Sequence, residues 1–185
     1  MAGAAPSFSE VHVLRTLLML RKKHGRKRLT DSLDLGEGSI RTILKKLKTH
    51  GLIESDEYGQ KLSAKGKRYL KKYLDKFDAP EKFSSTDLDG KQVLCVVHDA
   101  SKRVRSGVME RDTAIKSGAN GALILTFNKK LKFPNKDVNL EDYEDLNSKL
   151  KGKKFRNGDV VVIGFADNYA NAENGAVAIV LGLLG

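Results

Sequence analysis

The stretch LGEGSIRTILKKLKTHGLI, residues 35–53, combines apolar and basic residues in a helical pattern. Apolar residues recur within it at the 0, 3, 4, 7 spacing of a core-facing helix, and the lysines and Arg41 fall on the other side. Such a helix presents positive charge to whatever lies outside the core. A nucleic-acid groove and bulk solvent are the two environments that this pattern allows.

The chemistry expected of an enzyme has little support in the sequence. The four histidines are scattered along the chain, and a single cysteine, Cys95, cannot build a structural zinc site. Neither a nucleophile-elbow motif nor a phosphate-binding loop with Gly-Lys-Ser/Thr is present. Cys95 lies in an apolar run, which favours a buried, inert thiol. We therefore expect no catalytic residue, no metal site and no cofactor.

Composition indicates a folded protein of one or two small domains. The 185 residues are 40% hydrophobic and 31% charged, with a net charge of +11. The longest apolar run, residues 175–184, is half of the roughly 20 residues needed to span a bilayer. The chain does not open with a signal-peptide pattern, and one cysteine fits a reducing compartment. We expect a cytoplasmic protein with no membrane partner.

Positive charge is concentrated in the first half of the chain. Residues 1–83 hold 19 Lys/Arg and 10 Asp/Glu, a balance of +9, whereas residues 84–185 hold 15 and 13, a balance of +2. An uneven distribution of this kind indicates that one half meets a polyanion. The first half is therefore the candidate for nucleic-acid binding.

The first half is predicted to contain three helices, a β-hairpin and a fourth helix. Helical periodicity identifies the helices, and short apolar segments around a turn identify the hairpin. Gly51 is expected to end the third helix, and Gly36 is expected to take a positive φ in the turn that precedes it. The predicted elements are helices at residues 9–23, 28–33, 38–50 and 63–77, and strands at 52–54 and 60–62.

This order, together with two short motifs, resembles the winged helix-turn-helix domain of prokaryotic transcription regulators. Residues 51–54 (GLIE), a turn, and then residues 62–66 (LSAKG) resemble the GLI…LT-x-KG wing signature of those proteins. Residues 36–41 (GEGSIR) resemble their turn and the start of their recognition helix. The resemblance covers residues 8–77 and implies a winged helix-turn-helix DNA-binding domain.

Helix-turn-helix docking assigns roles to the basic residues. The first residues of the second helix of the motif reach base edges, which indicates Ser39, Arg41, Thr42 and Lys45. Phosphate contacts position a protein without reading sequence, and the hairpin offers a further contact. The candidates for these roles are Lys46, Lys48, Arg26, Lys27 and Arg28 at phosphates, and Gln60 and Lys61 at the wing.

The second half, residues 89–185, is predicted to be a mixed α/β domain that follows a linker at residues 78–88. A proline and three successive hydroxyl residues indicate the linker. Continuous apolar runs predict buried strands, and a strand, a helix and a second strand form a βαβ-like unit. The predicted elements are strands at 92–98, 122–127, 159–165 and 176–184, helices at 108–117 and 140–150, and a polar loop at 167–175.

A basic loop before the predicted helix at residues 108–117 is a candidate anion site. A helix N-terminus exposes free amides that favour anions, and the polar loop at 167–175 can complete a pocket. The alternatives are a solvated basic loop, and Asx side chains that cap a long hairpin. The candidate ligand residues are Lys102, Arg103, Arg105, Ser106, Arg111, Asp167 and Asn168.

Over its whole length the chain resembles archaeal winged-helix proteins whose C-terminal half is a domain of unknown function. The tract at residues 111–122 (RDTAIKSGANGA) carries this likeness. We expect a transcription regulator that binds double-stranded DNA as a homodimer, because two half-sites require two copies. Its second domain is expected to sense a small metabolite, for which the basic loop indicates an anion, to dimerise, or both.

Two other functions compete with this expectation. The first is an enzyme that acts on a small phosphorylated metabolite and carries an appended winged helix. Archaeal riboflavin kinases share that layout, but their catalytic half is a β-barrel. The second is a winged helix that docks a protein, which the salt dependence of binding would distinguish from one that binds DNA.

Overall fold

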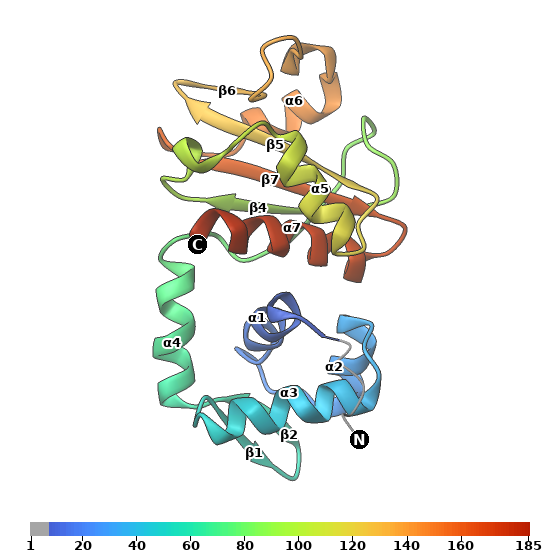
Figure 1. Ribbon diagram of the computed structural model, residues 1–185, viewed down its shortest axis with the longest axis vertical. Helices are drawn as coiled ribbons and strands as arrows, with labels where there is room; N and C mark the ends of the chain where they lie inside the picture. Colours follow the sequence, from blue (N-terminus) through green and yellow to red (C-terminus); the bar gives the residue numbers. More distant parts are fainter. Residues whose placement is uncertain (1–7) are drawn as a thin grey trace. The chain divides into compact units, whose positions relative to one another are not determined.

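The computed structural model describes residues 8–185, which form two compact units that divide between Asp75 and Lys76. The first unit is helical with one hairpin, and the second is a mixed α/β unit (Figure 1). No helix within the described residues is long and apolar enough to cross a membrane.

The first unit contains its elements in the predicted order, which is consistent with a winged helix-turn-helix domain. Its first helix is shorter than predicted, because the chain leaves the helix at Leu20 and the backbone of His24 pairs with that of Gln60. The elements are α1 (Glu10–Met19), α2 (Arg26–Leu33), α3 (Glu37–Thr49), β1 (Ile53–Asp56), β2 (Gly59–Leu62) and α4 (Ala64–Leu74).

Helix α3 buries the apolar stripe that its periodicity predicts. Its buried residues are Ile40, Ile43, Leu44 and Leu47. The prediction for the preceding turn is wrong in one detail. Gly36 has φ −62°, and it is Asp34 that takes the left-handed conformation, with φ 53°. Aspartate tolerates that region better than most residues, so the turn does not require the glycine. Gly51, with φ 69°, ends the segment as predicted.

The second unit is built on a five-stranded sheet in the order β3-β4-β7-β5-β6, in which all neighbouring strands are antiparallel. Strands β4 and β5 are therefore parallel to one another, with β7 between them. The predicted strand-helix-strand order exists, but its two strands are not neighbours. The strands are β3 (Glu81–Phe83), β4 (Lys91–Val97), β5 (Gly121–Asn128), β6 (Lys130–Lys132) and β7 (Val160–Ala166).

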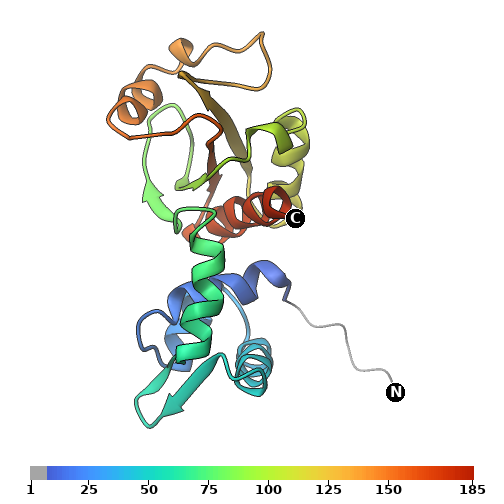
Figure 2. The same cartoon turned by 90° about the vertical axis from the view of Figure 1, so that its left-hand side faces the viewer.

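Helices cover both faces of this sheet (Figure 2). Helices α5 (Val108–Lys116) and α7 (Tyr169–Leu184) pack on one face, against β4, β5 and β7. On the other face, α6 (Glu144–Lys151) and the segment before it bury a core. Because both faces are buried, β4 and β7 are continuous apolar runs, as predicted. The core on the α6 side contains Leu94, Val96, Leu125, Phe133, Leu140, Leu146, Leu150, Val161 and Ile163.

The C-terminal segment is a helix, so the predicted loop at 167–175 and the predicted strand at 176–184 are wrong. Helix α7 begins after Asn168, whose side-chain oxygen accepts a hydrogen bond from Asn171 N at 2.8 Å. A fully buried apolar run has no polar face, so its periodicity does not separate a strand from a helix. Its length and its alanine content favour the helix.

The predicted linker at residues 78–88 is also not an open connection. Strand β3 lies within it, at the edge of the sheet, and pairs with β4. Phe77, predicted as the end of the fourth helix, is fully buried and bridges to Val97 of β4. Proline and hydroxyl residues resemble a linker in composition, but an edge strand tolerates them as well.

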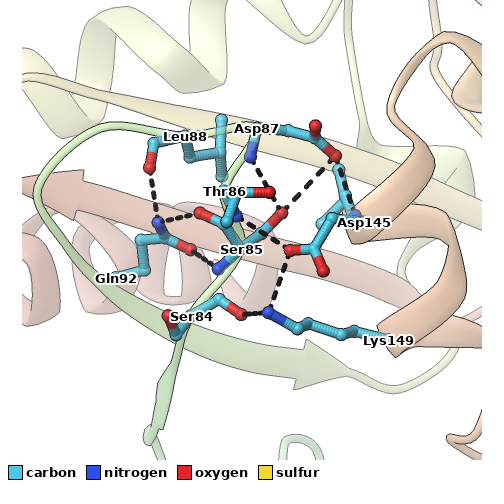
Figure 3. Close-up of polar contacts among 9 residues, drawn as sticks. Ser84, Ser85, Thr86, Asp87, Leu88, Gln92, Asp145 and Lys149 are labelled. Carbon is cyan, nitrogen blue, oxygen red and sulfur yellow. Dashed lines mark hydrogen bonds and ion pairs between the residues drawn. The ribbon is translucent and has the colours of Figure 1, made fainter.

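Residues 84–88 form a loop that is hydrogen-bonded to α6 (Figure 3). Asp145 of α6 accepts from Thr86 N at 2.8 Å, and Asp87 accepts from Leu146 N at 2.8 Å. The buried side chain of Gln92 holds the other side of the loop, because its amide nitrogen donates to the carbonyl oxygens of Ser85 and Leu88. These bonds attach α6 to the sheet through polar groups as well as through its apolar face.

Replacing Asp145 with asparagine should make the free energy of unfolding less dependent on pH in the acid range. The hydrogen bonds from Lys149 and Thr86 N lower the pKa of Asp145 from its usual 3.8 to about 2. A carboxylate whose pKa is lowered in the folded state stabilises the fold at pH values above its ordinary pKa. This contribution to the free energy of unfolding is lost as the pH falls from about 4 to about 2. Chemical unfolding measured across this pH range should show the free energy of unfolding of the wild type falling toward that of Asp145→Asn. A constant difference between the two proteins would contradict the assignment.

Candidate functional site

The exposed face of α3 carries the basic side chains that the sequence indicated. Arg41, Thr42, Lys45 and Lys48 are exposed, whereas the opposite stripe is buried. The hydroxyl of Thr42 donates to Gly38 O at 2.9 Å within the helix. α3 therefore offers cationic groups and one partly engaged hydroxyl on a single face.

A groove of about 300 Å³ lies between α3, the start of α2 and the hairpin. We call it the basic groove. Four of its lining side chains are cations and none is acidic. It brings together five of the residues predicted to contact DNA and adds three that the sequence did not indicate. The lining residues are Arg26, Arg41, Leu44, Lys45, Lys48, Ile53, Ser55 and Gln60.

The hairpin is held beside α3 by backbone contacts to the segment after α1. His24 and Gln60 exchange two backbone hydrogen bonds, of 3.0 and 2.9 Å. Gly59 has φ +138°, and a Cβ at this position would lie 2.6 Å from His24 O. Only glycine fits this close approach, so the position of β2 against residue 24 depends on it.

The positive potential at this end of the unit affects His24. Its pKa is lowered from 6.5, first by burial and then by the charges of Arg28 and Lys22. Burial and like charge both disfavour the imidazolium. His24 therefore adds no charge near neutral pH, and the cations around it remain the source of the potential.

The other predicted DNA contacts lie outside the lining of the basic groove. Lys61 Nζ lies 3.8 Å from Glu54 Oε2 across the hairpin. Lys46 Nζ lies over the ring of Phe8, 5.2 Å from its centre. The side-chain oxygen of Gln60, inside the groove, is buried and has no hydrogen-bond partner in residues 8–185. The remaining candidates, on α2 and α3, are Ser39, Thr42, Lys27 and Arg28.

The tip of the hairpin carries an aromatic residue that the sequence analysis missed. Tyr58 is 74% exposed, and Lys23 Nζ lies 5.5 Å from the centre of its ring. The signal was present in the chain, because a two-residue turn before Gly59 places Tyr58 at the tip. Lys23 is also ion-paired with Asp56, so the exposed ring is the group at the hairpin tip that can reach the backbone or the bases of a nucleic acid.

The predicted anion site at the start of α5 is filled by the protein itself. The carboxylate of Glu110 accepts from Gly107 N at 2.8 Å and from Arg105 N at 3.0 Å. Ser106 Oγ accepts from Met109 N at 3.3 Å. Glu110 is buried, so a carboxylate of the protein already occupies the turn that leads into α5 and accepts from two of its amides. Glutamate at the third position of the helix was the overlooked signal.

Asp167 and Asn168, the predicted second part of the ligand site, are not gathered around this loop. Arg103 donates to Leu183 O at 2.7 Å, at the C-terminal end of α7. Asp167, which accepts from Asn120, and Asn168 lie at the opposite end of that helix. A helix of 16 residues is about 24 Å long. The two ends therefore do not form one pocket, while Lys102, Arg105 and Arg111 are exposed near the start of α5.

His98 and Cys95 are two further groups of the second unit with potential for chemistry, and the structure gives both a structural setting. His98 lies between two carboxylates, with Nε2 3.2 Å from Asp78 and Nδ1 3.3 Å from Asp159. Burial raises the pKa of the Cys95 thiol well above its ordinary value, which makes the thiol inert. Among the described residues there is no group of three or more side chains that could hold a metal ion.

Comparison with other proteins gives matches in both units. Residues 88–183 match the model of a domain of unknown function (DUF4443), and residues 11–68 match that of the PH0730-like, N-terminal domain. The solved structure of a hypothetical protein, PH0730 from Pyrococcus horikoshii OT3, is similar over 94% of this chain and 91% of that chain. The two are 31% identical, with a TM-score of 0.81. No curated protein matches the chain.

Proposed function

We propose that this chain, which belongs to the DUF4443 family, is a transcription regulator whose first unit is a winged helix-turn-helix domain that binds duplex DNA. The observation that carries the proposal is the basic groove, whose four cations are concentrated on one surface with no acidic residue in its lining. A surface of this kind neutralises phosphates and releases their counterions.

The geometry of α3 and the hairpin supports a duplex rather than a small anion as the ligand. α3 has 13 residues and exposes one continuous polar face, and the major groove admits an α-helix. The hairpin lies beside it, with Ser55 and Gln60 in the wall of the groove and Tyr58 at the tip. A helix in the major groove and a hairpin along the adjacent backbone form one extended contact.

The charge of each unit favours the same assignment. Residues 1–75 hold 17 Lys/Arg against 8 Asp/Glu, which leaves +9, and residues 76–185 hold 17 against 15, which leaves +2. Nearly all of the excess charge therefore belongs to the unit that contains the basic groove. An excess of this size steers a polyanion toward that unit.

In the proposed regulator, the second unit dimerises, senses a small ligand, or does both. α5 exposes three large apolar side chains, Val108 at 58%, Met109 at 49% and Ile115 at 42%. Three large exposed apolar side chains on one short helix favour a contact surface there. A second copy of the chain is the partner that a two-half-site operator requires.

The test of the function is the salt dependence of binding to a labelled random duplex, measured by fluorescence anisotropy on the full chain. Phosphate contacts predict an affinity that falls steeply as salt rises between about 50 and 200 mM. A protein-docking surface predicts no DNA binding at all. Absence of binding at the low end of this range would refute the proposal.

Single substitutions on α3 should separate base contacts from phosphate contacts. Arg41→Ala and Lys45→Ala should each weaken binding to a selected sequence by about 1–3 kcal/mol, with a smaller effect on random duplex, because base contacts discriminate. Lys48→Ala should weaken both duplexes alike, because a phosphate contact reads no sequence. The sequence is first selected from a randomised library. Equal effects of all three variants on both duplexes would place readout on the hairpin.

A further inference from the structure

A second groove lies in the α/β unit, on the face of the sheet opposite α5 and α7. It has a volume of about 280 Å³ and lies between β5, β6, α6 and the segment that follows α6. We call it the aromatic groove. No part of the proposed DNA contact uses it. Its lining residues are Phe127, Lys130, Leu131, Leu140, Glu141, Asn147, Leu150, Lys151, Lys153 and Phe155.

The floor of the aromatic groove is apolar. Phe127 and Phe155 pack with their ring centroids 5.8 Å apart and their planes tilted by 43°. Both rings are half-buried, whereas Leu140 and Leu150 belong to the buried core behind them. Half-buried rings beside a packed core present an apolar surface to a ligand, and small-molecule sites are commonly lined by such side chains.

The rim of the aromatic groove is positively charged. The lining contains three lysines and one acidic residue, Glu141. Lys153 forms an ion pair with Glu81. Lys130 and Lys151 are exposed, and neither has an ion-pair partner within residues 8–185. Two lysines without an ion-pair partner outnumber the single acidic residue of the rim. Together with the apolar floor they complement a ligand that is apolar at one end and anionic at the other.

The walls of the aromatic groove are held in place without a ligand. α6 contributes Asn147, Leu150 and Lys151, and it is attached to the 84–88 loop through Asp145 and Leu146 (Figure 3). A site that is already formed loses little free energy in ordering when it binds. The volume suits one or two rings rather than a larger molecule.

We propose that the aromatic groove binds a small aromatic anion, whose rings lie on Phe127 and Phe155 and whose carboxylate or phosphate meets Lys130 and Lys151. This site gives the ligand-sensing unit its ligand class. It rests on the proposed function only for its regulatory meaning, because binding to it requires no DNA.

The test compares 2-naphthoate with the neutral 2-naphthalenemethanol on the full chain. The chain has no tryptophan, so naphthalene fluorescence anisotropy is read with little protein background. Naphthoate should bind about ten-fold more tightly than the alcohol, since two partly exposed ion pairs each contribute modestly. The amide NMR signals that move should belong to residues lining the aromatic groove, including Phe127, Leu131 and Leu150.

Removing the lysines and removing the acidic residue of the rim should have opposite effects on the preference for naphthoate. The double variant Lys130→Gln with Lys151→Gln should remove the ten-fold preference for naphthoate, and Glu141→Gln should increase it. The control, Lys116→Gln with Lys154→Gln, removes the same charge outside the groove and should change nothing. Equal binding of both probes, signals that move elsewhere, or no binding at millimolar probe would overturn the proposal. Loss of DNA binding alone would refute the regulator and leave this site standing.

Discussion

Replacing Arg26, Arg41, Lys45 and Lys48 together with glutamine should lower the affinity for duplex DNA at least about a thousandfold at low salt. These four side chains are the cations of the basic groove. The slope of log affinity against log salt should fall by about 1.8 if only Arg26 and Lys48 meet phosphates, and by about 3.6 if all four do. Fluorescence anisotropy over a salt series measures both quantities.

The control for this variant removes the same charge from the other unit. Lys116, Lys132, Lys136 and Lys154 are exposed in the second unit, and their replacement with glutamine also lowers the net charge from +11 to +7. The control should keep most of the affinity, because its lysines lie outside the basic groove. Equal losses in the two variants would mean that overall charge, and not this groove, attracts the DNA.

Alanine at Gly164 or Gly175 should destabilise the second unit, and we expect the larger effect at Gly164. A Cβ on Gly164 of β7 would lie 2.3 Å from Ala172 O and 2.9 Å from Ala176 N, both of them backbone atoms of α7. The whole helix would have to move away from the sheet, at a cost of about 3 kcal/mol or more. A Cβ on Gly175 would lie 2.5 Å from the Cβ of Ala119, which cannot rotate away.

The same helix provides the matched control for these variants. A Cβ on Gly182 of α7 would meet no atom within 4 Å beyond its own helix backbone and chain neighbours, so alanine fits there. Gly182→Ala should raise the stability by up to about 1 kcal/mol, because alanine favours the helix. Urea unfolding followed by circular dichroism should therefore give opposite signs for Gly175→Ala and Gly182→Ala. If Gly164→Ala and Gly175→Ala were both as stable as the wild type, the tight packing of α7 would be refuted.

Local patterns in the sequence were sufficient for most elements of the first unit. The stripe of α3 is an amphipathic period that can be read without any partner, and Gly51 ends the segment through its own backbone freedom. The hairpin follows from a turn between two short apolar segments. These features depend on neighbours along the chain, so one sequence determines them.

The C-terminal helix is an element that local sequence patterns did not predict. A fully buried apolar run carries no alternation, and the predicted strand at 176–184 became part of α7 because the sheet offered it a face to cover. The position of β7 between β4 and β5 is likewise a pairing between distant segments. Strand order follows from contacts between residues that are far apart in the sequence, and the periodicity of one strand does not encode these contacts.

The candidate sites divide in the same way. The sequence by itself determined the cations of α3, because they share one helical face. Only the tertiary structure placed Arg26, Ser55 and Gln60 beside that face, filled the start of α5 with the carboxylate of Glu110, and separated Arg103 from Asp167 by the length of α7. Side chains along one helix are neighbours by geometry, whereas side chains on different elements become neighbours only when the core packs.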